Sequence, residues 1–247
     1  YILGPSDSLA TLLKGYGYET RAFHPGERTS WQRNIAYPRL GFDSFKCGED
    51  MDVPQTEEHG YVSDDSDFEQ IIWEFEHKDE STPLFLFNVT IQNHGSYTVE
   101  DYPAEVQLAD EPGAYPKAEQ YLTLANKTDE AFKKLIDYFS AQTEPTILVM
   151  FGDHQPSVEQ EFLDKAYGVT QDEMTMAQYM DKFKVPFIIW ANYPLTGDST
   201  KITSLNFLAQ YVLCNAGIET SAYGKYLWNL QKTIPAMTFA GYFDSEG

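Results

Sequence analysis

The stretch Thr146-Ile-Leu-Val-Met-Phe-Gly-Asp-His-Gln-Pro156 decides how the rest of the chain is interpreted. Residues 146–151 form a short run of β-branched, aromatic and other apolar side chains, which is typical of a strand buried on both faces. Gly152 ends the run, and Pro156 prevents the chain from continuing a hydrogen-bonded ladder. The stretch therefore predicts a buried parallel strand with Asp153 and His154 directly after its carboxyl end.

Asp153 and His154 lie where an open α/β sheet usually binds its ligand, outside the carboxyl ends of the strands. A carboxylate oxygen beside an imidazole nitrogen suits Zn, Mn or Fe better than Ca. The alternative is that Asp153 caps a loop and His154 is an ordinary surface residue. Two adjacent residues do not decide between a metal site and a loop.

The composition excludes several classes of protein. A length of 247 residues fits one large domain or two small ones. The net charge of -21 argues against binding nucleic acid or an anionic lipid surface through a basic patch. No apolar run reaches the roughly 18 residues of a membrane span.

The chain starts at Tyr1, so we interpret it as a piece of a longer protein. Cys47 and Cys214 are too few for a disulfide framework and are expected to be unpaired thiols.

Hydrophobic periodicity predicts that helices and strands alternate along the chain. Helices are expected within 7–14, 30–37, 63–75, 118–139, parts of 157–182, and 204–215, and strands within 18–23, 41–45, 84–91, 146–151 and 185–190. Residues 98–117 are expected to form a long surface loop, and the aromatic tail 223–247 to be mostly irregular with a small strand or two. This alternation predicts an α/β fold, with a mainly parallel sheet covered by helices on both faces, in a single domain over 1–247.

Three of the predicted strands end in residues that can do chemistry, namely His24, His94, and Asp153 with His154. Parallel strands place their carboxyl ends at one edge of the sheet, so these four side chains are expected to converge there. His24 also has a structural interpretation as a core or capping histidine.

Other polar and aromatic residues are predicted either to join this site or to lie elsewhere on the surface. Trp31 and Arg33 are expected over the same edge, where a guanidinium fork matches a phosphate or sulfate. The alternative is that Trp31 belongs to the core and Arg33 is a solvated surface residue. His59 and His77 lie in polar, acidic stretches and are interpreted as surface residues.

The order of the motifs resembles the lipoteichoic acid synthase family, sulfatase-like enzymes of the alkaline phosphatase superfamily. The resemblance extends from about residue 7 to about residue 218. The motifs in chain order are Gly15-Tyr-Gly-Tyr with Phe23-His24, then Ser30-Trp31-Gln32-Arg33, Gly41-Phe42-Asp43, Asn93-His94, Gly152-Asp153-His154 and Val185-Pro186-Phe187. Each motif is short, and their order and spacing are more specific than any one of them.

The resemblance implies phosphoglycerol transfer at the extracellular face of the cell membrane. Asp153 and His154 match the family's metal-binding pair, for Mn²⁺ or Mg²⁺, and His24, Trp31, Arg33 and His94 match the positions that hold the substrate head group. The donor would be a phosphatidylglycerol-type lipid, and the acceptor a glycerol-phosphate or glycan hydroxyl. A covalent glycerophospho-threonine would form between the two steps, and the implied chemistry is that of metal-assisted nucleophilic catalysis.

The sequence departs from the family at its amino-terminal side. The family's Glu ligand and Thr nucleophile precede the region matched by His24, so we expect this chain to be the carboxyl-terminal part of a catalytic domain, inactive alone. A transmembrane tether would lie upstream, outside the chain. Two alternatives stay open: a sulfatase or phosphoethanolamine transferase of the same superfamily, and a non-catalytic extracellular binding module.

Overall fold

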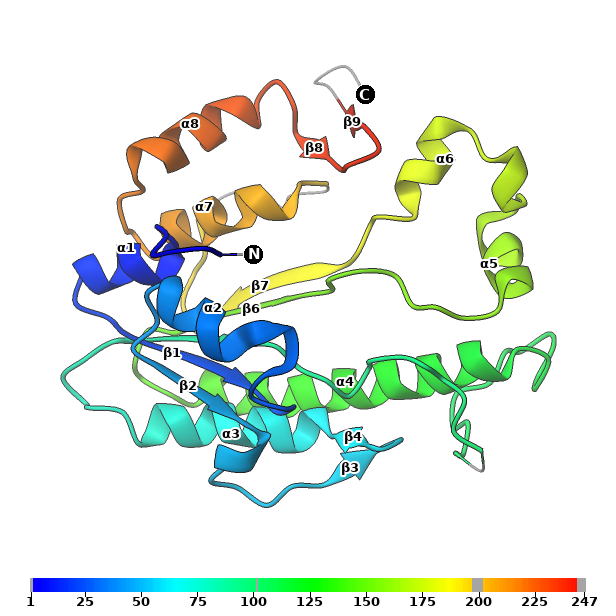
Figure 1. The fold of residues 1–247 in the computed structure, drawn as a ribbon, viewed down its shortest axis with the longest axis horizontal. Coiled ribbons are helices and arrows are strands. Elements are labelled where there is room, and N and C mark those ends of the chain that lie inside the picture. The colour runs from blue at the N-terminus through cyan, green and yellow to red at the C-terminus, as the bar shows by residue number, and fades with distance from the viewer. Residues whose placement is uncertain (1, 101, 197–201, 244–247) are drawn as a thin grey trace. The chain divides into compact units, whose positions relative to one another are not determined.

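The computed structural model describes residues 2–100, 102–196 and 202–243 (Figure 1). The chain divides into two compact units, Tyr1–Asp137 and Tyr138–Gly247. The elements that begin in the first unit are α1 (Leu9–Gly15), β1 (Glu19–His24), η1 (Ser30–Gln32), α2 (Arg33–Arg39), β2 (Ser44–Cys47), η2 (Gly48–Asp50), β3 (Glu57–Glu58), β4 (Tyr61–Val62), α3 (Asp64–Glu76), β5 (Leu84–Asn88) and α4 (Pro116–Ser140). Those of the second are β6 (Ile147–Phe151), α5 (Gln160–Tyr167), η3 (Gln171–Glu173), α6 (Met176–Asp181), β7 (Phe187–Ala191), α7 (Leu205–Asn215), α8 (Ala222–Leu230), β8 (Ala236–Met237) and β9 (Tyr242–Phe243).

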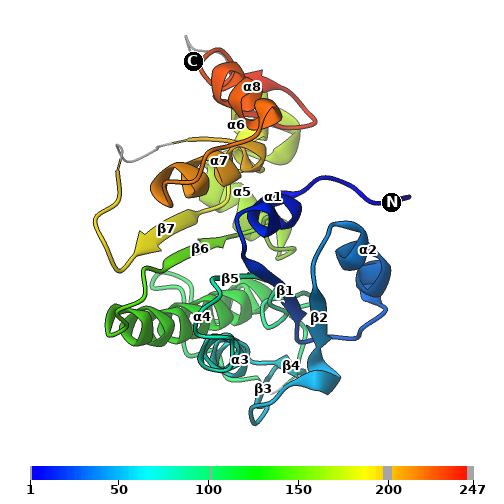
Figure 2. The same ribbon diagram turned by 90° about the vertical axis from the view of Figure 1, so that its left-hand side faces the viewer.

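The first unit contains a parallel sheet in the order β2-β1-β5. Helices α1 and α2 lie on one face of this sheet, and α3 and α4 lie on the other (Figure 2). The centre of β1 is closed off from water, with Ala22 2% and Phe23 1% exposed. The predicted α/β fold with a parallel sheet and covering helices is therefore confirmed.

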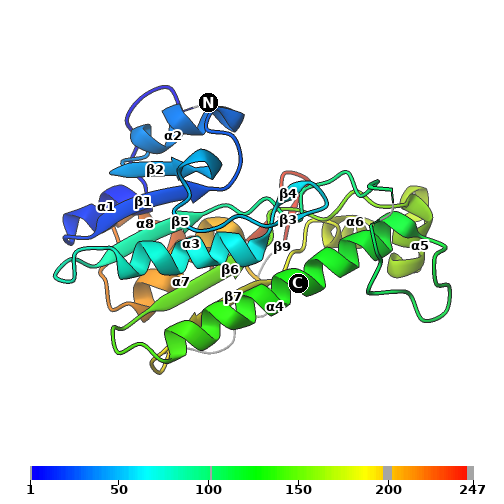
Figure 3. The ribbon, with the colours of Figure 1, turned by 90° about the horizontal axis from the view of Figure 1, so that it is seen from below.

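Local capping explains where two of these helices begin. The Ser8 hydroxyl accepts the backbone N–H groups of Ala10 and Thr11 at the start of α1, and the Ser63 hydroxyl accepts that of Ser66 at the start of α3. Helices α3 and α4 lie side by side (Figure 3), with the rings of Phe68 and Phe132 6.2 Å apart. An apolar stripe of α4 is buried at Leu124, Phe132, Leu135 and Phe139.

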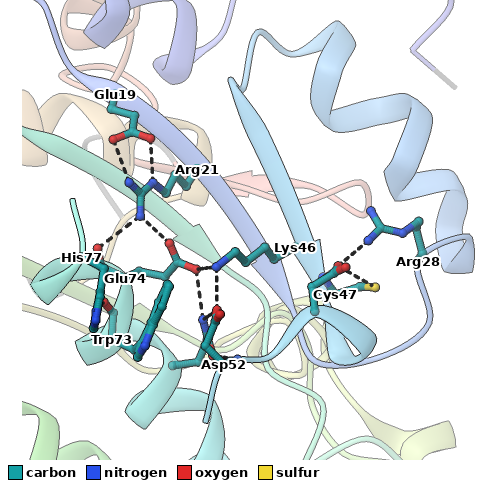
Figure 4. Close-up of polar contacts among 11 residues, drawn as sticks. Glu19, Arg21, Arg28, Lys46, Cys47, Asp52, Trp73, Glu74 and His77 are labelled. Atoms are coloured by element: carbon teal, nitrogen blue, oxygen red, sulfur yellow. Dashed lines mark hydrogen bonds and ion pairs between the residues drawn. The ribbon is translucent and has the colours of Figure 1, made fainter. Parts of the chain in front are cut away.

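A buried carboxylate connects α3 to two strands of the sheet (Figure 4). The Glu74 side chain is 2% exposed, and its oxygens lie 2.5 Å from Arg21 Nη1 on β1 and 2.8 Å from Lys46 Nζ on β2. Lys46 also lies over the Trp73 ring, 4.2 Å from its centroid. Because Arg21 also pairs with Glu19 and Lys46 with Asp52, every charge of this cluster has a partner of opposite sign. Nearby, the buried Cys47 thiol donates to Asp50, and both Cys47 and Cys214 are free, as predicted.

The second unit corrects two predictions about strand β6. It pairs antiparallel with β7, from Ile147 opposite Ala191 to Phe151 opposite Phe187, rather than in parallel. Its side chains are partly exposed, and Phe151 is 37% exposed, rather than buried on both faces. An apolar run indicates burial but carries no information about strand direction. Strand β5 also has partly exposed side chains, because β1 is its one sheet neighbour among the described residues.

The tail is more regular than predicted. Residues 222–230 form helix α8, and Leu227 on it is 7% exposed. The Ser221 hydroxyl accepts the Gly224 backbone N–H and caps the helix. The prediction of an irregular tail was wrong because aromatic composition hid a helical spacing and its cap. Strands β8 and β9 are the small strands expected there, and the predicted end of the tail, 244–247, lies outside the described residues.

Two carboxylates are buried at the start of α3. Asp64 and Asp67 are each 0% exposed, and Oδ1 of Asp64 and Oδ2 of Asp67 have no hydrogen-bond partner among the described residues. Burial raises the pKa of Asp64 to about 6. Burial, with the charge of Asp64 adding to it, raises the pKa of Asp67 well above its ordinary value. Folding therefore favours the protonated acids.

The free energy of unfolding should consequently fall as these acids ionise. A folded-state pKa above the unfolded value gives a stabilisation that is complete below the ordinary Asp pKa of 3.8. It is lost as the pH rises through about 6 for Asp64 and through the raised pKa of Asp67. Asp67→Asn, which resembles the neutral acid, should raise the free energy of unfolding by on the order of 1 kcal/mol or more at pH 8 and by less at pH 5. Urea unfolding at both pH values measures this.

The matched control is Asp65→Asn, on the same turn of α3 but exposed to solvent. It should change the free energy of unfolding by less than about 0.5 kcal/mol at either pH. An Asp67→Asn variant with the parent's dependence on pH would contradict the assignment of a buried, protonated Asp67.

Candidate functional site

The six residues predicted for the site are divided between the two units. His24 ends β1, Trp31 lies in η1 and Arg33 is the first residue of α2. His94 follows β5, and all four of these belong to the first unit. Asp153 and His154 follow β6 in the second unit, so the convergence of all six on one sheet edge stays a prediction.

His24 is a buried, neutral imidazole. It is 2% exposed, and its Nδ1 donates to the Val89 carbonyl oxygen at 2.7 Å. Burial lowers the His24 pKa, the bond to Val89 opposes this, and the charges of Arg33 and His94 lower it further. With the proton on Nδ1, Nε2 of the neutral ring is a hydrogen-bond acceptor. His24 is thus suited to accept a hydroxyl proton from a ligand.

Arg33 carries the fixed positive charge of this site. Its Nη1 donates to the Ser30 carbonyl oxygen at 3.1 Å, and its charge acts on the Tyr37 side chain. Burial raises the Tyr37 pKa, and the Arg33 charge opposes that rise. Arg33 forms no ion pair with any residue that the structure describes. A partly exposed guanidinium with no carboxylate partner in this part of the chain is suited to bind an anion.

The backbone before Arg33 is strained and turns Trp31 outward. Trp31 (φ 56°) and Gln32 (φ 54°) both adopt the left-handed conformation, which costs on the order of 1–3 kcal/mol for each non-glycine residue. Trp31 is 87% exposed, which excludes the alternative that it belongs to the core. Strain that presents a large aromatic side chain to solvent is characteristic of a binding site.

His94 is exposed and lies against a short hairpin. Its Nδ1 lies 2.7 Å from the Gly95 carbonyl oxygen, which leaves Nε2 available. The Tyr61 hydroxyl lies 3.4 Å from the same Nδ1, and the two rings meet edge to face with centroids 5.6 Å apart. Tyr61 comes from strand β4, so the β3–β4 hairpin forms one side of the His94 site.

The prediction that His59 is a surface residue was wrong. His59 is partly buried, its Nε2 lies 2.6 Å from the Gln92 carbonyl oxygen, and its ring packs on Tyr61 and Tyr97. Polar, acidic neighbours hid this role in the sequence, although His59-Gly60 marks a tight turn with φ of 37° and 93°. His77 is exposed and stacks on Trp73, so its surface assignment is confirmed.

Asp153 and His154 present a carboxylate and an imidazole side by side. Their side chains are 84% and 78% exposed, and His154 Nε2 lies 3.5 Å from Asp153 Oδ2. His154 Nδ1 lies 2.9 Å from the Gln155 carbonyl oxygen, which places its proton there and leaves the Nε2 lone pair free. These donors fit a divalent metal such as Mn²⁺. Over the described residues no cluster of three or more His, Cys, Asp or Glu completes a metal site, so the pair supplies two ligands.

A family model described as Sulfatase matches residues 2–218. This chain belongs to the sulfatase family. The sulfatase-family chain is 31% identical over 238 residues to a Rhizobium meliloti (strain 1021) protein named for cyclic beta-1,2-glucan modification, covering 92% of this chain and 36% of that protein. It is 28% identical over 181 residues to lipoteichoic acid synthase-like YvgJ of Bacillus subtilis (strain 168), covering 72% of this chain and 28% of YvgJ.

Structural comparison shows a similar fold in a solved structure. The fold resembles Streptococcus pyogenes phosphoglycerol transferase GacH in complex with sn-glycerol-1-phosphate, with a TM-score of 0.72, 19% identity, and coverage of 89% of this chain and 55% of GacH. The chain is lipoteichoic acid synthase-like and a member of the alkaline phosphatase superfamily, which confirms the resemblance. It spans 36% and 28% of the lengths of the two curated relatives. No helix in the described ranges combines the length and apolarity needed to cross a membrane.

Gly26 is required for the position of His24, which the sequence did not indicate. A Cβ at Gly26 would lie 2.5 Å from His24 Nε2. Gly26→Ala should therefore push the imidazole away from the Val89 carbonyl and lower the free energy of unfolding by about 1–3 kcal/mol. Gly15→Ala is the control, because a Cβ there meets nothing within 4 Å. Urea unfolding of both variants checks this, and equal stability of the two would show that His24 can move freely.

Proposed function

We propose that the protein containing this chain is a phosphoglycerol transferase of the lipoteichoic acid synthase type. The observation that carries the proposal is the position of Arg33 and His94, which both lie close enough to the neutral His24 for their positive charges to lower its pKa, in a chain with a net charge of -21. A phosphate is the ligand that such an isolated positive group recognises best. Membership of the sulfatase family supports phosphoryl or sulfuryl chemistry at this group.

Each side chain has a distinct role in the proposed head-group site. The Arg33 guanidinium binds two phosphoryl oxygens and stabilises the charge that develops on them. Nε2 of His94 donates to a third oxygen when the ring is protonated. The neutral His24 accepts a hydrogen bond from a glycerol hydroxyl, because its Nε2 is an acceptor. The exposed Trp31 ring covers the glycerol carbons.

Asp153 and His154 would hold the catalytic metal, Mn²⁺ or Mg²⁺. When bound, the metal lowers the pKa of the attacking hydroxyl and neutralises the phosphoryl oxygens. The 3.5 Å separation of the two donor atoms allows both to bind one ion. In this proposal the threonine that forms the covalent glycerophospho-threonine, and the remaining metal ligands, lie outside these 247 residues. The chain alone would then be inactive.

The proposed donor is a phosphatidylglycerol-type lipid, and the proposed acceptor is a glycan hydroxyl. The relative named for cyclic beta-1,2-glucan modification is 31% identical over 92% of this chain, against 28% over 72% for the lipoteichoic acid synthase-like relative. That difference favours a glycan over a growing glycerol-phosphate polymer as the acceptor. The reaction would take place at the extracellular face of the membrane, with the tether in another part of the protein.

A sulfatase is the second candidate, because the matching family model is described as Sulfatase. Arg33 would bind a sulfate as readily as a phosphate. Release of diacylglycerol from phosphatidylglycerol supports the transferase, whereas hydrolysis of an aryl sulfate without that release supports the sulfatase. A protein with neither activity that still binds glycerol phosphate would be a binding module.

Arg33→Ala tests the proposed phosphate contact in the whole protein. With Mn²⁺ and phosphatidylglycerol, kcat/KM for diacylglycerol release should fall by about 10²–10³, because a transition-state charge loses its partner. The control is Arg28→Ala, in the same segment, where the guanidinium is already paired with Asp50. Arg28→Ala should keep kcat/KM within about threefold of the parent. Equal losses in the two variants would exclude a special role for Arg33.

A further inference from the structure

A buried chain of hydrogen bonds connects helices α3 and α4 to the loop that carries His94. The Thr128 hydroxyl on α4 lies 2.6 Å from Asp64 Oδ2 on α3, and the Asn93 side-chain amide lies 2.7 Å from the same hydroxyl. Gln92 joins the chain twice, with Nε2 3.1 Å from Thr128 Oγ1 and Oε1 2.9 Å from the Asp64 backbone nitrogen. Two helices are therefore connected to the two residues that directly precede His94.

The direction of each hydrogen bond follows from the capacity of the Thr128 hydroxyl. A threonine hydroxyl has one proton to donate and two lone pairs. The amide groups of Gln92 and Asn93 can only donate to it, and they occupy both lone pairs. Its single proton is then directed to the Asp64 carboxylate at 2.6 Å, rather than to the Leu124 carbonyl at 3.1 Å. The arrangement is complete when an acceptor oxygen stands at position 64.

Burial makes this arrangement rigid. Asp64 is 0%, Gln92 1% and Thr128 6% exposed, so water does not replace a lost partner. His94, in contrast, is exposed, and the position of its side chain follows from the backbone of 92–95. His59 also contacts this segment, because its Nε2 lies 2.6 Å from the Gln92 carbonyl oxygen.

We propose that Asp64 and Thr128 are positioning residues for His94, and that their hydrogen bond through Asn93 and Gln92 sets where the imidazole meets the phosphoryl group. This inference rests on the proposed function, because it assigns a role to residues behind the head-group site. A displacement of about 1 Å at a substrate-contacting group can reduce a rate by about 10²-fold. Neither residue touches the substrate, so their effect acts through the loop.

The test removes the Thr128 hydroxyl with little change in volume. Thr128→Val should reduce kcat/KM for diacylglycerol release by the whole protein by about 10–100-fold, mainly through kcat. Amide hydrogen exchange at Asn93 and His94 should become about tenfold faster or more, because the loop opens locally. Thr128→Ser keeps the hydroxyl and should restore both values to within about threefold of the parent.

The matched control is Thr123→Val on the same helix. Thr123 is 1% exposed, and its hydroxyl accepts the Val106 backbone N–H at 3.1 Å, away from the His94 loop. It should lower the urea midpoint of unfolding as Thr128→Val does, while leaving kcat/KM and exchange at His94 close to the parent.

The outcomes separate this inference from the proposed function. A parent protein that releases no diacylglycerol contradicts the proposed function, whereas faster exchange at His94 in Thr128→Val alone still supports the positioning role. Parent-like rates and exchange in Thr128→Val overturn the inference. Equal losses in Thr123→Val and Thr128→Val, or a Thr128→Ser variant as impaired as Thr128→Val, overturn it as well.

Discussion

Strand β1 is hydrogen-bonded along both of its edges, and the proposed head-group site depends on that position. Its parallel pairing with β5 places Phe23 opposite Asn88, and the next residues of the two strands are then in contact, with His24 Nδ1 donating to the Val89 carbonyl. Its pairing with β2 places His24 opposite Cys47. The segment that connects these two strands carries Trp31 and Arg33. One register thus fixes the imidazole, its tautomer and the start of the His94 loop.

Charge is distributed unevenly over this framework. Arg21, Lys46 and Arg28 neutralise Glu74, Asp52 and Asp50 in contacts that join strands, helix and loop. Arg33 has no such partner among the residues that the structure describes, although acidic residues outnumber basic ones in the chain, 38 to 17. A cation kept apart from this excess of carboxylates retains its capacity to bind an external anion.

Short-range patterns in the sequence were enough to find the strand ends, and with them His24, His94 and Asp153-His154. The same patterns did not predict contacts between residues far apart in the sequence. Gly26 and His59 act through approaches that the chain makes only after folding, and a first-turn Asp such as Asp64 is usually exposed, so its burial carried no sequence signal. The apolar run of β6 predicted a strand but not its antiparallel partner, and the aromatic tail hid the spacing of α8.

Several features of the first unit reduce stability, and they occur in connected residues. Trp31 and Gln32 adopt a left-handed backbone conformation, and the His24 imidazole is desolvated by burial. Asp64 is a buried acid that is linked through Thr128 to Asn93. A purely structural sheet edge would be more stable with apolar residues at these positions. Unfavourable features gathered around one set of side chains are the pattern expected where selection maintains a binding geometry at the expense of stability. The same reasoning separates this region from the Glu74 cluster, where each charged side chain has a partner of opposite charge.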